Sequence, residues 1–362
     1  MSSVIPSEAR DRVQLFQHHI RAAATNSSPL RIRGSGSKDF YGSALEGDLL
    51  DTRTHTGIVA YEPTELYVTA RCGTPIAELE RALDAQGQML AFEPPRHSPD
   101  ATVGGMVAAG LSGPRRVQAG AIRDYVLGVE LLDGNAQVLR FGGRVIKNVA
   151  GYDVSRLLCG SLGTLGLITE VTLKVLPRPA AELSLRFELS QADALARLNR
   201  WAGQPLPISA SCWHDGVLVL RLSGAAVALA AARATLGGEP VSDVEAGEFW
   251  RALRDQTHAF FGAATLWRLS LPASAPMLDL PGATLLEWHG GQRWLAGGEA
   301  ANVREAAARA GGHAALYRGD AIARNAGAFA PLSEPMLALH RRVKQVFDPA
   351  GILNPGRLYA EL

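Results

Sequence analysis

Three glycine-rich segments are the part of this sequence whose residue types and spacing could do chemistry. The first, Arg33-Gly-Ser-Gly-Ser37, combines two glycines with two small hydroxyl side chains. Glycine lets neighbouring backbone N–H groups turn toward one anion, and serine hydroxyls add further donors. Such a segment could bind a phosphate group, or it could be only the turn that ends a strand.

The other two segments have the same ambiguity when each is taken alone. Residues 100–110 (DATVGGMVAAG) allow a backbone to approach a flat or anionic ligand, or they form the closely packed start of a helix. Residues 160–169 (GSLGTLGLIT) space three glycines by three, with Ser161 and Thr164 between them. Glycine in folded segments costs about 0.5–1 kcal/mol relative to alanine, so three such segments need a common reason. One large phosphate-bearing ligand, laid along a single domain, explains all three.

Signatures of other chemistries are absent from the sequence. There is no G-x-x-x-x-G-K-[ST], no H-E-x-x-H and no G-x-S-x-G. Gly34-Ser-Gly36 begins like a Rossmann fingerprint, but Asp39 stands where the third glycine is required. The nine histidines show no metal-ligand spacing, so we predict no metal site. No residue stands out as catalytic, and catalytic residues are left unassigned.

Charge and composition exclude several classes of protein. The chain has 36 basic and 35 acidic residues, a net charge of +1, so it has no electrostatic footprint for nucleic acid or a membrane surface. Three widely spaced cysteines without C-x-x-C predict no disulfide framework and a cytoplasmic location. No run of 18 uninterrupted apolar residues occurs, so we expect no membrane span.

Hydrophobic periodicity and turn residues predict the elements that position the glycine segments. We expect helices over 7–24 and 75–86, and strands over 30–33, 66–70, 126–132, 137–141 and 165–175. The strand over 30–33 runs directly into the first glycine segment. The strand over 165–175 begins inside the third, so strand ends bring these segments to their ligand.

The length of 362 residues is enough for about two domains, and proline punctuation suggests where they meet. Pro177-Arg-Pro179 separates a first domain, 1–178, from a second, 179–330. The second alternates strand and helix patterns, which predicts a small α+β domain with helices on an antiparallel sheet. Residues 331–362 are again dense in glycine and proline, and we expect them to pack back on the first domain.

Five motifs follow one another along the chain. They are Arg33-Gly-Ser-Gly-Ser-Lys38, Ala101-Thr-Val-Gly-Gly105, Lys147-Asn-Val-Ala-Gly-Tyr-Asp153, Gly160 to Thr169, and Phe347-Asp-Pro-Ala-Gly-Ile-Leu-Asn-Pro-Gly356. In order and wording they resemble the FAD-binding domain of the p-cresol methylhydroxylase and vanillyl-alcohol oxidase superfamily. Within it, the chain is similar to the family of FAD-binding subunits of glycolate oxidase (glycolate dehydrogenase), a likeness that includes Met106 to Arg116. The resemblance implies an α+β fold: a two-subdomain FAD-binding domain, a smaller α+β domain, and a C-terminal segment that returns to the first.

The same resemblance implies which residues hold FAD. Backbone amides of Gly34 to Ser37 would bind the pyrophosphate, Ile168 would lie beside the adenine, and Asn354 would reach the flavin edge. The full implied set is Arg33, Gly34, Ser35, Gly36, Ser37, Lys38, Thr102, Val103, Gly104, Gly105, Gly110, Gly160, Ser161, Gly163, Thr164, Gly166, Ile168 and Asn354. No His, Tyr or Cys stands at a clear position for the covalent flavin link known in the family, so we expect non-covalent FAD.

The second domain departs from its relatives. Related 2-hydroxy-acid dehydrogenases carry H-x-G-D-G-N-x-H there, whereas this chain reads Glu287-Trp-His-Gly-Gly-Gln-Arg-Trp294. His289 is then a polar residue at a strand end rather than a catalyst, although Arg268 and Arg293 could bind a carboxylate. The departure favours a flavin-bearing subunit that assists assembly or relays electrons. Its implied partners are a homologous flavin-containing catalytic subunit, which oxidises a small 2-hydroxy acid, and an iron–sulfur subunit.

Two other functions stay open at this point. One is a stand-alone FAD-dependent 2-hydroxy-acid dehydrogenase, and the other is a non-redox nucleotide-binding module that uses the same glycine segments. In each case we expect a cytoplasmic protein, with attachment to a membrane through partners as a further option.

Overall fold

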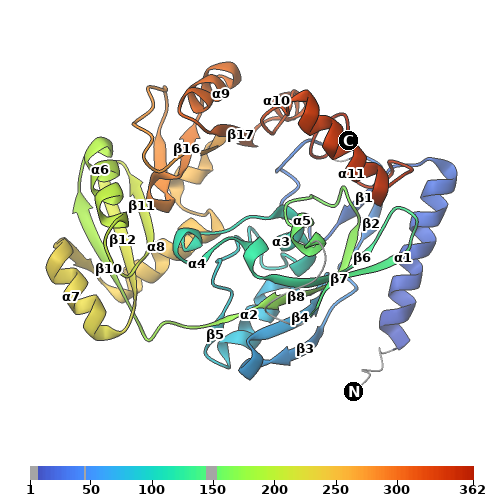
Figure 1. The fold of residues 1–362 in the computed structure, drawn as a ribbon, viewed down its shortest axis with the longest axis horizontal. Helices are drawn as coiled ribbons and strands as arrows, with labels where there is room; N and C mark the ends of the chain where they lie inside the picture. Colours follow the sequence, from blue (N-terminus) through green and yellow to red (C-terminus); the bar gives the residue numbers. More distant parts are fainter. Residues whose placement is uncertain (1–6, 45, 144–152) are drawn as a thin grey trace.

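Two large sheets organise the computed structural model, which describes residues 7–44, 46–143 and 153–362. In Figure 1 a five-stranded sheet lies low in the centre and an eight-stranded sheet lies to its left. The order in the smaller sheet is β3 (Ile58–Glu62), β4 (Tyr67–Arg71), β8 (Leu167–Lys174), β6 (Val126–Leu132) and β7 (Val138–Gly142). Four of its strands were predicted from periodicity, and the structure confirms them within two residues.

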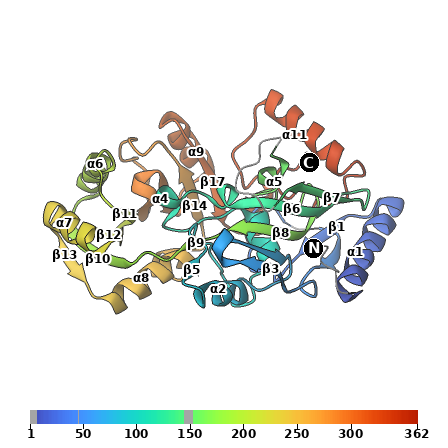
Figure 2. The same ribbon diagram turned by 60° about the horizontal axis from the view of Figure 1, so that its bottom comes forward.

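The first glycine segment follows strand β1 (Leu30–Arg33), which pairs with β2 (Asp48–Asp51) in a separate two-stranded parallel sheet. The predicted N-terminal helix is confirmed as α1 (Ser7–Asn26), and it covers this sheet (Figure 2). Phe16 and Ile20 of the helix pack with Leu30 and Leu50 in one apolar cluster. Since β1 ends at Arg33, the helix fixes the point at which the glycine segment begins.

Two helices cover the five-stranded sheet and carry the second glycine segment. α2 (Ile76–Asp84) buries Ile76, Leu79 and Leu83, and α3 (Val103–Ala109) buries Val103, Met106 and Val107 in the same core. A short pair of strands, β5 (Gln88–Met89) and β9 (Leu176–Pro177), closes this part of the chain. α3 therefore starts inside residues 100–110, as the packed-helix interpretation of that segment required.

The eight-stranded sheet is antiparallel throughout. Its order is β13 (Glu239–Val241), β10 (Ala181–Glu188), β12 (Val217–Gly224), β11 (Ile208–His214), β15 (Thr284–Glu287), β16 (Gln292–Ala296), β14 (Leu266–Ser270) and β17 (His313–Arg318). α6 (Gln191–Ala202), α7 (Ala226–Leu236) and α9 (Ala300–Arg309) pack on its outer side, which confirms the predicted helical face (Figure 2). Among the described residues, no helix has the length and apolar character to cross a bilayer.

The inner side of that sheet packs on the part of the chain that precedes β10, which we call the first part; β10 to β17 and their helices form the second part. Trp294 and Tyr317 share an apolar cluster with Tyr41 and Ala109, together with Trp250 from α8 (Asp243–Asp255). The 3-10 helix η4 (Trp288–Gly290) and the short helix α4 (Arg116–Ala119) meet at the same interface. At this boundary, loops and helices of the first part of the chain meet the inner side of the eight-stranded sheet.

The C-terminal segment packs beside β1 and the third glycine segment. After α10 (Ala321–Asn325), α11 (Glu334–Phe347) lays Phe347 against Phe141 of β7, with ring centroids 6.2 Å apart. The buried ammonium of Lys344 donates to the carbonyls of Thr164 and Leu353 at 2.8 and 2.7 Å. It also pairs with the buried Asp348 carboxylate at 2.7 Å. Asp348 in turn accepts from the backbone N–H groups of residues 352 and 353.

We predict that Asp348→Ala destabilises the protein by about 3–5 kcal/mol, because it leaves the Lys344 ammonium buried without a counter-ion. Thermal and denaturant unfolding measure the loss. Arg341→Ala is the matched control, because Arg341 is exposed and its ion pair with the exposed Glu334 is long, at 3.8 Å. It should change the free energy of unfolding by about 0.5 kcal/mol or less. Equal stability of the two variants would show that the buried pair does not hold the C-terminal segment.

Candidate functional site

The first glycine segment lines a pocket together with residues from the second segment and the C-terminal loop. The lining residues are Ile32, Arg33, Gly34, Ser35, Gly36, Ser37, Lys38, Asp39, Thr102, Gly105, Ala108, Ala109, Leu162, Asn354 and Arg357. From the predicted cofactor set, the structure brings together residues 33–38, Thr102, Gly105 and Asn354. The first two segments meet at Gly34, where a Cβ would lie 2.3 Å from Thr102 Oγ1.

The loop itself has the donors of an anion site. Within the described part of the chain, the backbone N–H groups of Ser35, Gly36 and Lys38 have no hydrogen-bond acceptor. Gly36 has a φ of +77°, and the Arg33 side chain lies over it, paired with Asp39 at 2.7 Å. Successive free N–H groups in such a turn bind anions, so the loop fits a diphosphate.

Lys38 adds a positive charge to this pocket. Its ammonium forms no hydrogen bond or salt bridge with any described residue. Burial lowers the pKa of Lys38 to about 8, against a smaller opposing effect of Asp255. A cation held out of water without an anion is costly, so this side chain also fits a pocket whose ligand is negatively charged.

Asn354 connects the C-terminal loop to the pocket through backbone contacts. Its Oδ1 accepts from the N–H of Ile32, and its Nδ2 donates to the carbonyl of Leu162, each at 2.7 Å. Gly163, with a φ of +77°, lies against the same amide, and a Cβ there would be 2.6 Å from Nδ2. Asn354 is only 4% exposed, and its two hydrogen bonds join β1 to the third segment. Its expected contact with the flavin edge stays a prediction.

Several predicted cofactor residues do not line this pocket. They are Val103, Gly104, Gly110, Gly160, Ser161, Gly163, Thr164, Gly166 and Ile168. Val103 and Ile168 are buried in the core of the five-stranded sheet. A Cβ on Gly104 would press on Cys72, and one on Gly166 would press on Leu131. Close packing is thus a sufficient reason for these two glycines, and their contact with FAD stays a prediction.

The motif 147–153 lies almost entirely outside the described residues. Its last residue, Asp153, precedes α5 (Val154–Leu157) and accepts from the N–H of Arg156. Among the described residues, no group of three or more His, Cys, Asp or Glu side chains could hold a metal ion.

A cluster of titratable and aromatic side chains beside Lys38 was missed by sequence reasoning. Tyr317 of β17 lies with its hydroxyl 3.3 Å from Nε2 of His97, and its ring contacts Phe40 and Tyr41. Burial, followed by the charge of Lys38, lowers the pKa of His97 to about 3, so this imidazole is neutral at physiological pH. The segments that carry Phe40, His97 and Tyr317 are far apart in the sequence and belong to no common motif. Only the fold shows that they meet.

Unusual backbone conformations mark both sides of the boundary between the two parts. Glu93 and His97 on one side, and Trp288 and His289 on the other, all have φ values between +48° and +60°. Left-handed conformations are strained for such residues and persist where the surrounding structure determines them. At Trp288 this surrounding structure includes a hydrogen bond across the boundary, since its Nε1 donates to the carbonyl of Gly113 at 3.0 Å.

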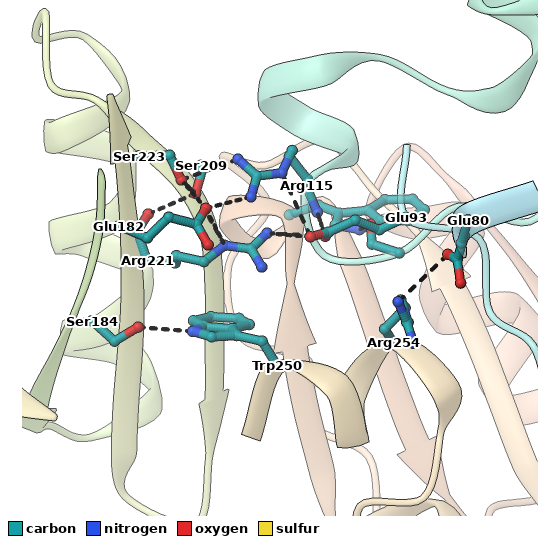
Figure 3. Close-up of polar contacts among 12 residues, drawn as sticks. Glu80, Glu93, Arg115, Glu182, Ser184, Ser209, Arg221, Ser223, Trp250 and Arg254 are labelled. Atoms are coloured by element: carbon teal, nitrogen blue, oxygen red, sulfur yellow. Dashed lines mark hydrogen bonds and ion pairs between the residues drawn. The ribbon is translucent and has the colours of Figure 1, made fainter. Parts of the chain in front are cut away.

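Glu93 is the centre of a buried network of charges across this boundary (Figure 3). Its carboxylate accepts from the N–H of Arg115 at 2.8 Å and from Nη2 of Arg221 at 2.9 Å. Arg115 also pairs with Glu182 at 2.5 Å, and Ser223 completes the group. Burial opposes ionisation of Glu93, but Arg221 and Arg115 outweigh it and lower the pKa of the carboxyl. Arg115 comes from the first part and Arg221 from β12, so the network fixes one part against the other.

The polar side chains of Glu287, Gln292 and Arg293 already form hydrogen bonds to other groups of the protein. Glu287, 4% exposed, accepts from Nε2 of Gln292 at 2.9 Å and from Nε1 of Trp294 at 2.7 Å, and burial raises its pKa. Arg293 is 2% exposed and donates to the carbonyls of Gly290, Ala275 and Pro276. The expectation that Arg293 could bind a carboxylate is therefore wrong, because backbone carbonyls take its donors. His289 is half-buried, and burial lowers its pKa.

We predict that Gly163→Ala lowers FAD affinity at least tenfold, because the new Cβ would displace the Asn354 amide and force a strained φ. The flavin absorbance retained after purification and a titration of apoprotein with FAD measure the effect. Gly247→Ala, in α8, is the matched control, since a Cβ there meets nothing within 4 Å. Full flavin content in Gly163→Ala would exclude the third segment from the site.

We also predict that Glu93→Ala costs about 3–5 kcal/mol at neutral pH, since two buried guanidinium groups lose their shared carboxylate. Because the pKa of Glu93 is lowered in the folded state, the stabilisation is present above the ordinary carboxyl pKa of about 4.3 and fades as the pH falls below it. The control is Glu188→Ala, whose partner Arg186 is 3.2 Å away in an exposed pair. Thermal unfolding between pH 7 and pH 3 measures both, and a cost that is unchanged down to pH 3 would contradict this account.

Comparison with known proteins gives the chain relatives along its whole length. The FAD binding domain family matches residues 12–142, and the family described as FAD linked oxidases, C-terminal domain, matches residues 322–358. The glycolate oxidase subunit GlcE of Escherichia coli (strain K12) is 50% identical over 355 residues, which are 97% of this chain and 99% of that protein. The glycolate oxidase subunit GlcD of Bacillus subtilis (strain 168) is 35% identical over 172 residues, 47% of this chain and 36% of that one.

A solved structure has the same fold at low sequence identity. The crystal structure of p-cresol methylhydroxylase with substrate bound superposes with a TM-score of 0.69 and 15% identity. The superposition covers 97% of this chain and 88% of that one. The predicted two-part architecture of the p-cresol methylhydroxylase type is thus confirmed.

Proposed function

Because this chain belongs to the family of the glycolate oxidase subunit GlcE, we propose that it is an accessory flavin subunit of a multi-subunit oxidase. Membership, with the two matching FAD families, establishes an FAD-dependent oxidoreductase subunit, and the name of the relative supports a complex with a partner subunit. The substrate of the assembled oxidase is glycolate or a similar 2-hydroxy acid. A homologous, catalytic flavin subunit is the first proposed partner, since the GlcD relative is 35% identical to this chain over 172 residues.

The chemistry that bound FAD would supply here is the relay of electrons between the partner subunits. The chain's own contribution is to hold and orient it. The free N–H groups of Ser35, Gly36 and Lys38 would bind the pyrophosphate, and the Lys38 ammonium would balance its charge. Among the described residues that line the pocket, none is His, Tyr or Cys, which supports the proposal of non-covalent binding.

The bonding of Glu287 is the observation that best supports an accessory role. Hydride removal from a 2-hydroxy acid needs a group that takes the hydroxyl proton. The acid that the second part buries on its inner sheet face is Glu287, and one of its oxygens already accepts from Gln292 and Trp294. We therefore place oxidation of the acid in the catalytic partner and propose an iron–sulfur subunit as the electron acceptor. The proposed location is the cytoplasm, with any membrane attachment made through these partners.

We predict that the purified chain carries about one FAD and that anaerobic glycolate or D-lactate leaves its flavin band unchanged. Acid precipitation should release the flavin to the supernatant, because no covalent bond holds it. Stopped-flow absorbance follows the flavin, and the reconstituted complex with both partners is the positive control. Colour in the pellet would contradict non-covalent binding, and rapid bleaching of the isolated chain would place the active site in this subunit.

A further inference from the structure

Three aromatic rings that can lose an electron are in contact beside the candidate FAD pocket. The ring of Tyr317 contacts those of Trp294 and Tyr41, with centroids 4.8 and 5.1 Å away. The backbone N–H of Tyr41 donates to the carbonyl of Lys38, which lines the pocket, at 3.0 Å. Tryptophan and tyrosine are the most easily oxidised of the ring side chains, and rings in contact exchange single electrons without movement of the chain. The three rings therefore form an electron path that begins next to the pocket.

The two most buried of these rings each have a hydrogen-bond partner that can take a proton. Tyr317 is 0% exposed, and its hydroxyl lies 3.3 Å from Nε2 of His97. When the neutral imidazole carries its proton on Nδ1, Nε2 accepts from this hydroxyl. Trp294 is 2% exposed and donates from Nε1 to the carboxylate of Glu287 at 2.7 Å. Each ring thus points its acidic hydrogen at a base.

Backbone carbonyls accept from other buried rings of the chain. Tyr125, 3% exposed, donates to a carbonyl at 2.6 Å, and the indoles of Trp213 and Trp288 also donate to carbonyls. These bonds satisfy a buried polar group and no more, because a carbonyl is too weak a base to keep a proton. Loss of an electron makes a phenol strongly acidic, and a positioned base then takes its proton. This difference separates Tyr317 and Trp294 from the other three rings.

We propose that Tyr317 is a redox-active tyrosine, which loses one electron through Trp294 or Tyr41 and gives its phenolic proton to His97. A one-electron oxidant of the oxyl-radical class takes the electron and becomes the corresponding oxyanion. The O–H bond of Tyr317 breaks, an N–H bond forms at Nε2 of His97, and a neutral phenoxyl radical stays in the core. The cofactor assigned to the pocket takes part in one-electron and dioxygen chemistry, which is a source of such oxidants.

The arrangement removes an oxidising equivalent from the pocket and holds it where water has little access. Tyr41, 7% exposed, is the member next to the pocket, and Tyr317 is the member with a base and no exposure. The proposal depends on the positions of these side chains and not on the accessory role of the subunit.

Pulse radiolysis of the FAD-loaded chain with azide radicals tests the proposal, because an azide radical takes one electron from a ring and becomes azide. We expect a tryptophanyl absorption that changes into a tyrosyl absorption at a rate independent of protein concentration. Tyr317→Phe keeps the ring but removes the phenol, so most of this transfer phase should be lost. Tyr125→Phe is the matched control, since Tyr125 is buried without a base, and it should leave the phase unchanged.

His97→Asn distinguishes proton transfer from a hydrogen bond that only holds the ring in place. Asparagine tolerates the left-handed φ of +60° at this position, but its amide cannot take the proton. The transfer phase should slow by about 100-fold in this variant. In the wild type the phase should also slow in deuterium oxide, because the phenolic proton moves with the electron.

Flavin content and thermal unfolding show which variants are folded, and His97→Asn decides the question if Tyr317→Phe does not fold. An unchanged transfer phase in the folded variants, or an equal loss in Tyr125→Phe, would overturn the proposal. A wild type that forms no tyrosyl radical would overturn it as well. No 2-hydroxy acid is present in this experiment, so its failure would leave the accessory role untouched.

Discussion

The side-chain amide of Asn354 joins three segments that are far apart in the sequence, and the arrangement of the pocket depends on it. It accepts from the N–H of Ile32, 322 residues away, and donates to the carbonyl of Leu162, 192 residues away. The buried Lys344–Asp348 pair fixes the loop that precedes Asn354, since Asp348 accepts from the N–H of Leu353. An apolar pair could be as stable in a core, but it would not present donors and acceptors to three backbones at once. Polar contacts here set position more than stability.

Buried ion pairs fix the boundary between the two parts of the chain, as the amide of Asn354 fixes the pocket. Glu93 and Glu182 satisfy Arg115 and Arg221, and the strained backbone of Glu93 directs its carboxylate between them. Buried ion pairs recover little net energy beyond their desolvation cost, yet they are strict about geometry. A boundary built in this way holds the second part at one orientation above the FAD-binding part.

The sequence was informative about strands and segments, and less so about what each glycine does. Periodicity located β4, β6, β7 and β8, because one face of each packs against the core. The resemblance implied that Gly34 and Thr102 both hold FAD, and in the structure the two residues lie side by side. Glycine alone does not distinguish a ligand contact from close packing, so Gly104 and Gly166 carried the same signal as Gly36. The contacts of Glu93, Tyr317 and Arg116 could not be predicted, because each joins residues that no local pattern connects.

A crystal structure of the chain with its own flavin tests the central claim most directly. We expect the pyrophosphate to accept hydrogen bonds from the N–H groups of Ser35, Gly36 and Lys38, with the Lys38 ammonium beside it. These groups have no acceptor among the described residues and need one. A pyrophosphate bound elsewhere, with the segment from Arg33 to Lys38 still free of contacts, would contradict the account.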